Sequence, residues 1–160
     1  MSNLLTNNLF DVMNEVQDLQ RVETPGACLT LTRSSTLSIT TAGTTITWQV
    51  ETRNNGFTWA TTDITIPTSG YYNISFSYTA TTNHTAFCRL IVNGVSVILF
   101  TDSSVSSTSH TFTAMRYFTD DDVVRIQPVP ASNTTISVVA ANSAGESPIL
   151  HVVQMTGSLT

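Results

Sequence analysis

Three histidines are the first residues to examine for chemistry, because imidazole binds metal ions and transfers protons near neutral pH. His84, His110 and His151 fall on separate strands or loops, and none has the close spacing of a zinc-binding pair. Only two cysteines, far apart in the chain, could add to them. The sequence therefore predicts no metal site, and each histidine is interpreted as a surface residue or a hydrogen-bonded core residue.

Catalytic arrangements of carboxylates or serines are not recognisable. Residues 145–148, Gly-Glu-Ser-Pro, are not the G-x-S-x-G nucleophile elbow, and the strand-to-helix context of that motif is absent. A carboxylate pair for glycoside hydrolysis could be drawn only from Glu51, Asp63, Asp102, the cluster at Asp120 or Glu146. Nothing in the sequence selects a pair, so we predict no catalytic residue, no cofactor and no enzyme activity.

Asp120, Asp121 and Asp122 form an acidic cluster with two possible interpretations. Several carboxylate oxygens suit a hard cation such as Ca²⁺. A solvated acidic turn before a strand would use the same residues, and the EF-hand spacing with its later glutamate is missing. We prefer the acidic turn and leave the calcium site as the alternative.

Cys28 and Cys88 are too few for a disulfide framework. Cys88 lies inside an apolar strand pattern, and Cys28 lies at the start of another. We predict two buried free thiols rather than a bridge, because free cysteine behaves as a small apolar side chain.

The composition is typical of one β-rich domain with room for a small appendage. The chain has 160 residues, of which 41% are hydrophobic and 11% charged, and this balance excludes disorder. Threonine favours strands, whereas serine and asparagine favour turns. The net charge is −5 and the chain has no lysine, so its surface should repel phosphate, and nucleic acid is not an expected partner.

Membrane association and secretion are not expected either. No apolar run approaches the roughly 20 residues that span a bilayer. Polar and acidic residues interrupt the apolar residues of the N-terminus, which does not resemble a signal peptide. We therefore expect synthesis in the cytoplasm without a signal peptide.

Residues 64–80 carry the clearest pattern in the chain. After a turn cluster at 67–70, apolar and polar residues alternate strictly. A period of two predicts a half-buried antiparallel strand. The apolar face of this strand holds Tyr72, Ile74, Phe76, Tyr78 and Ala80.

Shorter segments of the same kind recur on both sides of this stretch and predict about ten strands. They lie near residues 29–31, 37–39, 45–50, 63–66, 86–92, 95–100, 110–118, 123–127, 136–140 and 149–155. Asn93-Gly94 predicts a two-residue hairpin, residues 53–56 a turn and residues 128–133 a loop. Such spacing predicts a β-sandwich or jelly roll.

Subunit contacts are predicted from residues that depart from the main apolar faces. Trp59 and Tyr71 lie off these faces and are our candidates for an interface. Residues 86–92 are apolar on both faces apart from Arg89, which predicts cover from a second sheet and from a neighbouring subunit. The absence of lysine, a common blocker of sheet edges, favours edges covered by assembly.

The N-terminal region has a different character from the rest. Residues 3–21 are predicted to be a helix that ends at the sequence Thr-Pro-Gly of residues 24–26. This boundary divides the chain into an arm at 1–26 and a domain at 27–160. The helix could trimerise or dock as an arm, or it could lie on its own domain; a coiled coil and an extended arm both remain open. Its apolar residues recur at steps of four and three: Leu5, Leu9, Val12, Val16 and Leu19.

Four segments within residues 27–160 resemble the C1q/TNF-like jelly-roll family. Residues 64–72 look like its proline-to-glycine corner and aromatic strand, and 90–94 are similar to its Asn-Gly hairpin. Residues 120–126 fall where the family has a Gly-Asp turn into a valine-rich strand, although this chain has no glycine there. Residues 31–39, followed by 47–51, look like the version of this domain in tailed-phage virion proteins.

The resemblance implies a ten-stranded jelly roll that assembles into compact homotrimers and has no catalytic residues. In phages it implies a capsid decoration, head-fibre, tail-fibre or knob protein.

We predict a decoration (cement) protein on the outer capsid surface, with the major capsid protein or another virion protein as its partner. The alternative is a fibre-tip or knob module whose loops, 102–109 and 142–148, contact a host glycan or receptor. A secreted C1q-like signalling ligand is a third class, which would carry a signal peptide or collagen-like repeats.

Overall fold

The structure is a computed structural model that describes residues 26–101, 107–131, 135–140 and 148–155, with the side chains of 98–101 and 107 left aside. The predicted helix at 3–21, with Leu5, Leu9, Val12, Val16 and Leu19, lies outside the described residues. Most of the two loops proposed to contact glycans also lies outside them.

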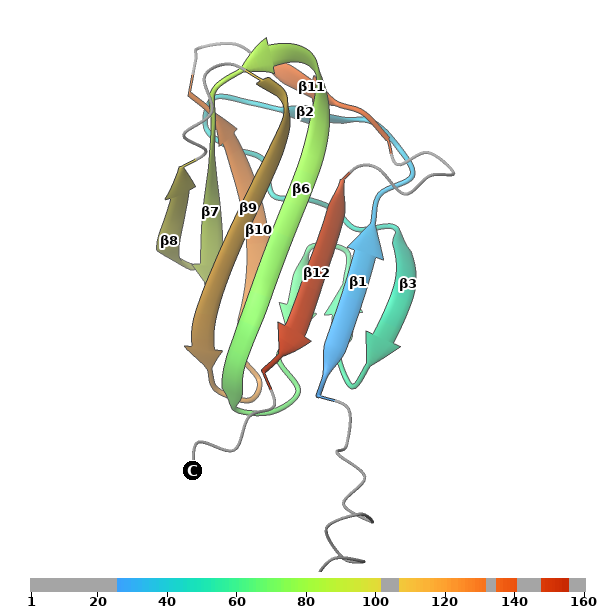
Figure 1. Ribbon diagram of the computed structural model, residues 1–160, viewed down its shortest axis with the longest axis vertical. Helices are drawn as coiled ribbons and strands as arrows, with labels where there is room; N and C mark the ends of the chain where they lie inside the picture. The colour runs from blue at the N-terminus through green and yellow to red at the C-terminus, as the bar shows by residue number, and fades with distance from the viewer. Residues whose placement is uncertain (1–25, 102–106, 132–134, 141–147, 156–160) are drawn as a thin grey trace, which may run out of the picture.

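The described residues form two antiparallel β-sheets (Figure 1). Seven strands make one sheet, in the order β2-β11-β6-β12-β1-β3, with β9 paired to β6; the other sheet has the order β4-β5-β10-β7-β8. This arrangement confirms the predicted all-β fold. The strands are β1 (Cys28–Thr32), β2 (Leu37–Ile39), β3 (Val50–Asn55), β4 (Thr58–Ala60), β5 (Asp63–Thr65), β6 (Gly70–His84), β7 (Ala86–Val92), β8 (Val95–Thr101), β9 (Ser107–Phe118), β10 (Val123–Pro130), β11 (Ile136–Val138) and β12 (Ile149–Gln154).

Strand β6 lies at the centre of the larger sheet, and the antiparallel strand that its sequence pattern predicts is confirmed. It pairs with β9 along one edge and with β12 along the other. Its predicted apolar face is buried between the sheets, where Tyr72 and Phe76 have exposed fractions of 0% and 1%. The Tyr72 hydroxyl donates to the carbonyl oxygen of Thr68 over 2.8 Å, so burying this ring leaves no unpaired polar group.

The prediction of a strand at 45–50 is wrong, because only Val50 belongs to one. The segment before it is nevertheless extended, and Ile46 and Trp48 are buried as the alternation suggests. The Ile46 amide donates to the Ile126 carbonyl, whereas the Trp48 amide donates to the Thr61 carbonyl. With the Gln49 amide donating to the Thr32 carbonyl of β1, the segment bonds to β10, to the turn between β4 and β5 and to β1 rather than along one neighbouring strand.

Two predicted breaks are also displaced. The turn expected at 53–56 is tighter, because β3 continues to Asn55 and Gly56 alone takes a left-handed φ of 93°. The loop expected from 128 begins later, because β10 runs on to Pro130. Pro128 is tolerated there because its backbone nitrogen, which cannot donate a hydrogen bond, faces away from β7. Its carbonyl accepts from the Thr44 amide, and the nitrogen and carbonyl of one strand residue point to the same side.

Strand β7 has the predicted bounds but only one fully buried face. Ala86, Cys88, Leu90 and Val92 are buried, and the residues between them are half-buried. Arg89, on the half-buried face, donates to Gln127 of β10 over 3.1 Å. Within one chain, the second sheet thus covers a single face of β7, and cover of the other face by a subunit stays a prediction.

Both cysteines are free and buried, which confirms the prediction for Cys28 and Cys88. Burial raises the pKa of the Cys88 thiol, because an apolar environment disfavours the thiolate. No helix in the described part of the chain has the length and apolar character to cross a membrane.

Candidate self-association face

The outer surface of β12, β6 and β9 is the candidate functional site. These strands lie side by side in the larger sheet (Figure 1), and every second residue points away from the core. Pairing sets Tyr71 of β6 opposite Tyr117 of β9, and Asn73 lies between Met115 and Val153. The Met155 amide donates to the Tyr71 carbonyl over 2.8 Å and brings Met155 to the same end of the sheet.

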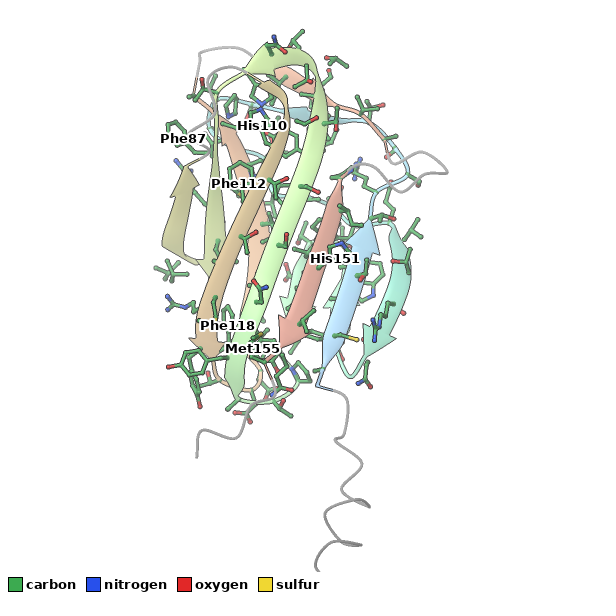
Figure 2. The ribbon with its side chains drawn as sticks, in the orientation of Figure 1. Phe87, His110, Phe112, Phe118, His151 and Met155 are labelled. Atoms are coloured by element: carbon green, nitrogen blue, oxygen red, sulfur yellow. The ribbon has the colours of Figure 1, made fainter. Side chains whose placement is uncertain are left out.

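Five side chains at this end form what we call the apolar face. Met115 is 67% exposed, and the two tyrosine rings, each 50% exposed, meet edge to face with centroids 5.3 Å apart. Figure 2 shows Met155 beside the lower ends of β6 and β12. Contiguous exposed apolar groups mark interaction surfaces, because they gain free energy on leaving water. The apolar face consists of Tyr71, Met115, Tyr117, Val153 and Met155.

The other end of the same surface is polar. Ser77 and Thr79 of β6 face Thr111 and Ser109 of β9, and these four line a hollow of about 480 Å³ together with residues 78 and 110. His151 of β12 lies between the two ends, where its Nδ1 is 3.1 Å from the Thr30 hydroxyl. The surface is thus divided along the strands into an apolar end and a hydroxyl-rich end.

The structure separates the two residues predicted for an interface. Tyr71 belongs to the apolar face. Trp59 lies on β4 in the other sheet, half-buried against the core, and its indole donates to Glu51 over 2.5 Å. An interface role stays a prediction for both residues.

Sequence reasoning missed most of the apolar face. It gave no interface role to Met115, Tyr117, Val153 or Met155. A signal was present, because Met115 and Tyr117 occupy the polar side of the alternation that Thr111 and Thr113 establish along β9. Apolar residues on the otherwise polar side of a strand indicate a surface that is covered by a partner.

The structure also brings together two histidines that the sequence does not connect. His84 and His110 have exposed fractions of 4% and 1%, and their ring centroids are 4.3 Å apart. His84 bonds to the Tyr78 hydroxyl and to the Thr82 carbonyl, as predicted for a hydrogen-bonded core residue. His151 is exposed on the surface. Among the described residues, no three or more His, Cys, Asp or Glu side chains are grouped to hold a metal ion.

The acidic cluster joins three turns. Asp120 accepts from the Ser69 hydroxyl over 2.9 Å, and Asp122 accepts from the Asn93 amide over 2.7 Å and from the Thr119 backbone over 2.9 Å. Burial acts to raise the pKa of Asp122, but the hydrogen bonds from Thr119 and Asn93 and the charge of Arg116 outweigh it and lower the pKa. These contacts support an acidic turn that stabilises one end of the sandwich.

Comparison with known proteins finds relatives by structure alone. No family model and no curated protein matches the sequence. Eiger TNF from S. frugiperda superposes with a TM-score of 0.59 at 12% identity, over 85% of this chain and 96% of that one. Murine APRIL gives a TM-score of 0.54 at 14% identity, over 81% and 98%. The globular domain of zebrafish complement 1qA protein gives 0.54 at 17% identity, over 82% and 98%.

These similarities define the class of fold. The chain is a C1q/TNF-like jelly roll, as the resemblance of its sequence motifs implies. At such low identity the comparison shows the fold alone, because one jelly-roll fold carries many functions.

Proposed function

We propose that this protein is a homotrimeric decoration protein that binds the outer surface of a phage capsid and stabilises it. The apolar face is the observation that carries the proposal, since it requires a partner surface. The resemblance of residues 31–39 and 47–51 to phage virion proteins supports a place in a phage particle. The net charge of −5 suits a surface turned toward solvent rather than toward packaged nucleic acid.

Self-association is the first part of the proposal. Three copies, each turning the outer surface of β12, β6 and β9 toward a common axis, would cover the apolar face with symmetric contacts. Fully burying one large apolar side chain contributes about 1.5–3 kcal/mol, so five half-exposed side chains per copy supply a substantial driving force. The C1q/TNF-like resemblance favours a trimer over other closed assemblies.

Capsid binding is the second part. Residues 1–26 would dock the trimer on the major capsid protein or another virion protein through Leu5, Leu9, Val12, Val16 and Leu19. Three weak arms on one trimer bind with avidity, because attachment of the first raises the effective concentration of the others. No single arm then needs to bind tightly.

A charge in the apolar face tests self-association. The full chain is expected to sediment as a trimer, and Tyr117→Glu as a monomer, because an unpaired charge in a buried contact costs roughly 3–5 kcal/mol. Val95→Glu is the matched control, since Val95 is 63% exposed on β8 in the other sheet. Analytical ultracentrifugation measures both variants. A Tyr117→Glu chain that still sediments as a trimer would show that another surface joins the copies.

Capsid binding is tested on particles. Antibody-gold electron microscopy of the encoding virus should label the head evenly, and deleting residues 1–24 should abolish binding to capsid shells. Label confined to the tail tip or a few fibres would favour the fibre-tip or knob function. If no particle is labelled, the proposal that this protein is part of the virion is refuted.

A further inference from the structure

Tyr78, His84 and His110 form a buried cluster between the ends of β6 and β9. The exposed fractions of the three side chains are 1%, 4% and 1%, and the ring centroids of Tyr78 and His110 are 5.2 Å apart. Figure 2 places His110 near the upper end of the larger sheet, far from Met155. The proposed function uses none of these groups.

The hydrogen bonds of His84 define its tautomer. Its Nδ1 is 3.0 Å from the Thr82 carbonyl oxygen, which can only accept, so Nδ1 carries the proton. In the neutral ring Nε2 is then an acceptor, and the Tyr78 hydroxyl donates to it over 2.9 Å. A second proton on His84 would turn Nε2 into a donor and break this bond in its present direction.

The surroundings of His84 oppose that second proton. Burial lowers the pKa of His84, and the proximity of His110 lowers it further, although the bond to Thr82 acts in the opposite direction. From β7, Ala86 carries no charge, and the next buried residue, Cys88, has a raised thiol pKa. Within the described residues no carboxylate contributes to the electrostatics of His84. A positive charge at His84 would therefore lack a compensating partner there.

The cluster lies where the pairing of the two strands is irregular. The register of β6 against β9 is continuous up to Thr79 and Ser109, and it resumes at His84 and Ser107 after a shift. Tyr78 and His110 also line the hydroxyl-rich hollow on the outer surface. The irregular pairing marks this end of β6 and β9 as a part of the sheet that can open locally without unfolding of the core.

We propose that Tyr78, His84 and His110 form an acid-sensitive latch, in which protonation of His84 removes the acceptor of the Tyr78 hydroxyl, places an uncompensated charge in the core and so releases the end of β6 from β9. The proton comes from solvent, and the change is reversible. Because the folded cluster resists a proton that the open form accepts, acid favours the open form. For one proton, the equilibrium constant for opening rises by up to about tenfold per pH unit below the ordinary histidine pKa.

Hydrogen exchange of the full chain tests the latch. After correction for the intrinsic exchange rate, residues 78–86 and 107–113 should exchange faster at pH 5 than at pH 7.5, whereas β1 and β12 should change little. His84→Gln should abolish the difference, because its amide can donate to Thr82 and accept from Tyr78 but does not titrate. His151→Gln is the control, since His151 lies outside the cluster, and it should keep the acid response.

The opposite outcomes would overturn the proposal. An acid response in His84→Gln equal to that of the natural chain would remove His84 from the mechanism. If His84→Gln does not fold, nitrogen NMR of the imidazoles in the natural chain decides instead. Uptake of a proton by His84 without faster exchange at 78–86 would refute the latch, as would an acid response that spreads evenly over both sheets.

Discussion

At the scale of single residues, Asp63 and Arg125 make a two-pronged ion pair between β5 and β10. The guanidinium Nε is 2.5 Å from Oδ1 and Nη2 is 2.8 Å from Oδ2. The bond from Arg125, the bond from Thr62 and the positive charge lower the pKa of Asp63 to about 2 against the effect of burial. The geometry is favourable, but both side chains are more than a third exposed, so water screens the pair.

Replacing this carboxylate has a pH-dependent effect. A lowered folded pKa contributes stability above the ordinary carboxyl value of about 4 and loses it as the pH falls to about 2. Asp63→Asn should therefore be slightly less stable than the natural chain at pH 7 and equally stable near pH 2. Urea unfolding at both values measures this, with Asp121→Asn as the control. A stability difference that persists at pH 2 would assign the effect to packing rather than to charge.

At the scale of elements, two turns contain glycines whose backbone conformation other residues adopt only at a cost in free energy. Gly94 and Gly43 both have left-handed backbones, with φ of 83° and 89°. A Cβ on Gly94 would meet nothing within 4 Å, whereas one on Gly43 would lie 2.9 Å from Val129 Cγ2 and 3.0 Å from Gln127. A substitution at Gly94 therefore introduces backbone strain alone, whereas one at Gly43 introduces backbone strain and steric overlap.

Alanine substitutions at these glycines should differ in cost. Gly94→Ala should destabilise the chain by about 1–2 kcal/mol, the cost of a left-handed conformation with a Cβ. Gly43→Ala should cost more, since overpacking against Val129 typically adds about 1–3 kcal/mol. Chemical denaturation compares the two variants. Equal losses would mean that Val129 moves aside freely.

Strand prediction succeeded where the pattern was local and failed where a partner segment decided. The period of two along β6 and the Asn93-Gly94 turn are written in neighbouring residues, and both are confirmed, with Asn93 at a φ of 51°. Pro128 reads as a loop residue in the sequence, yet β10 continues through it because the missing donor faces away from β7. No local rule contains that information.

At the scale of the whole molecule, one core holds both sheets together without a disulfide. Buried residues from both sheets make a single cluster, in which Trp48 and Phe76 meet edge to face with centroids 6.2 Å apart. Cys28 and Cys88 are both free. Stability therefore rests on packing and strand pairing rather than on a crosslink.

A reducing agent should consequently leave the stability unchanged. A structural disulfide typically contributes about 2–4 kcal/mol, and its loss would lower the melting temperature clearly. Thermal unfolding with and without dithiothreitol measures this.

Thiol labelling is the companion experiment, and Cys88 should react only when the chain unfolds because it is buried and protonated. Fewer than two labelled thiols after unfolding without reductant would contradict the free state.

The sequence by itself determined the β-rich class, most strand positions and the side of β6 that faces the core. These features follow from local alternation, since each residue's type and its neighbours in the chain decide them. Only the tertiary structure decided that Tyr71, Met115, Tyr117, Val153 and Met155 share one face and that His84 meets His110. Both groupings depend on which distant strands pair and in which register. That choice is made by packing of the whole core, which no short stretch of sequence encodes.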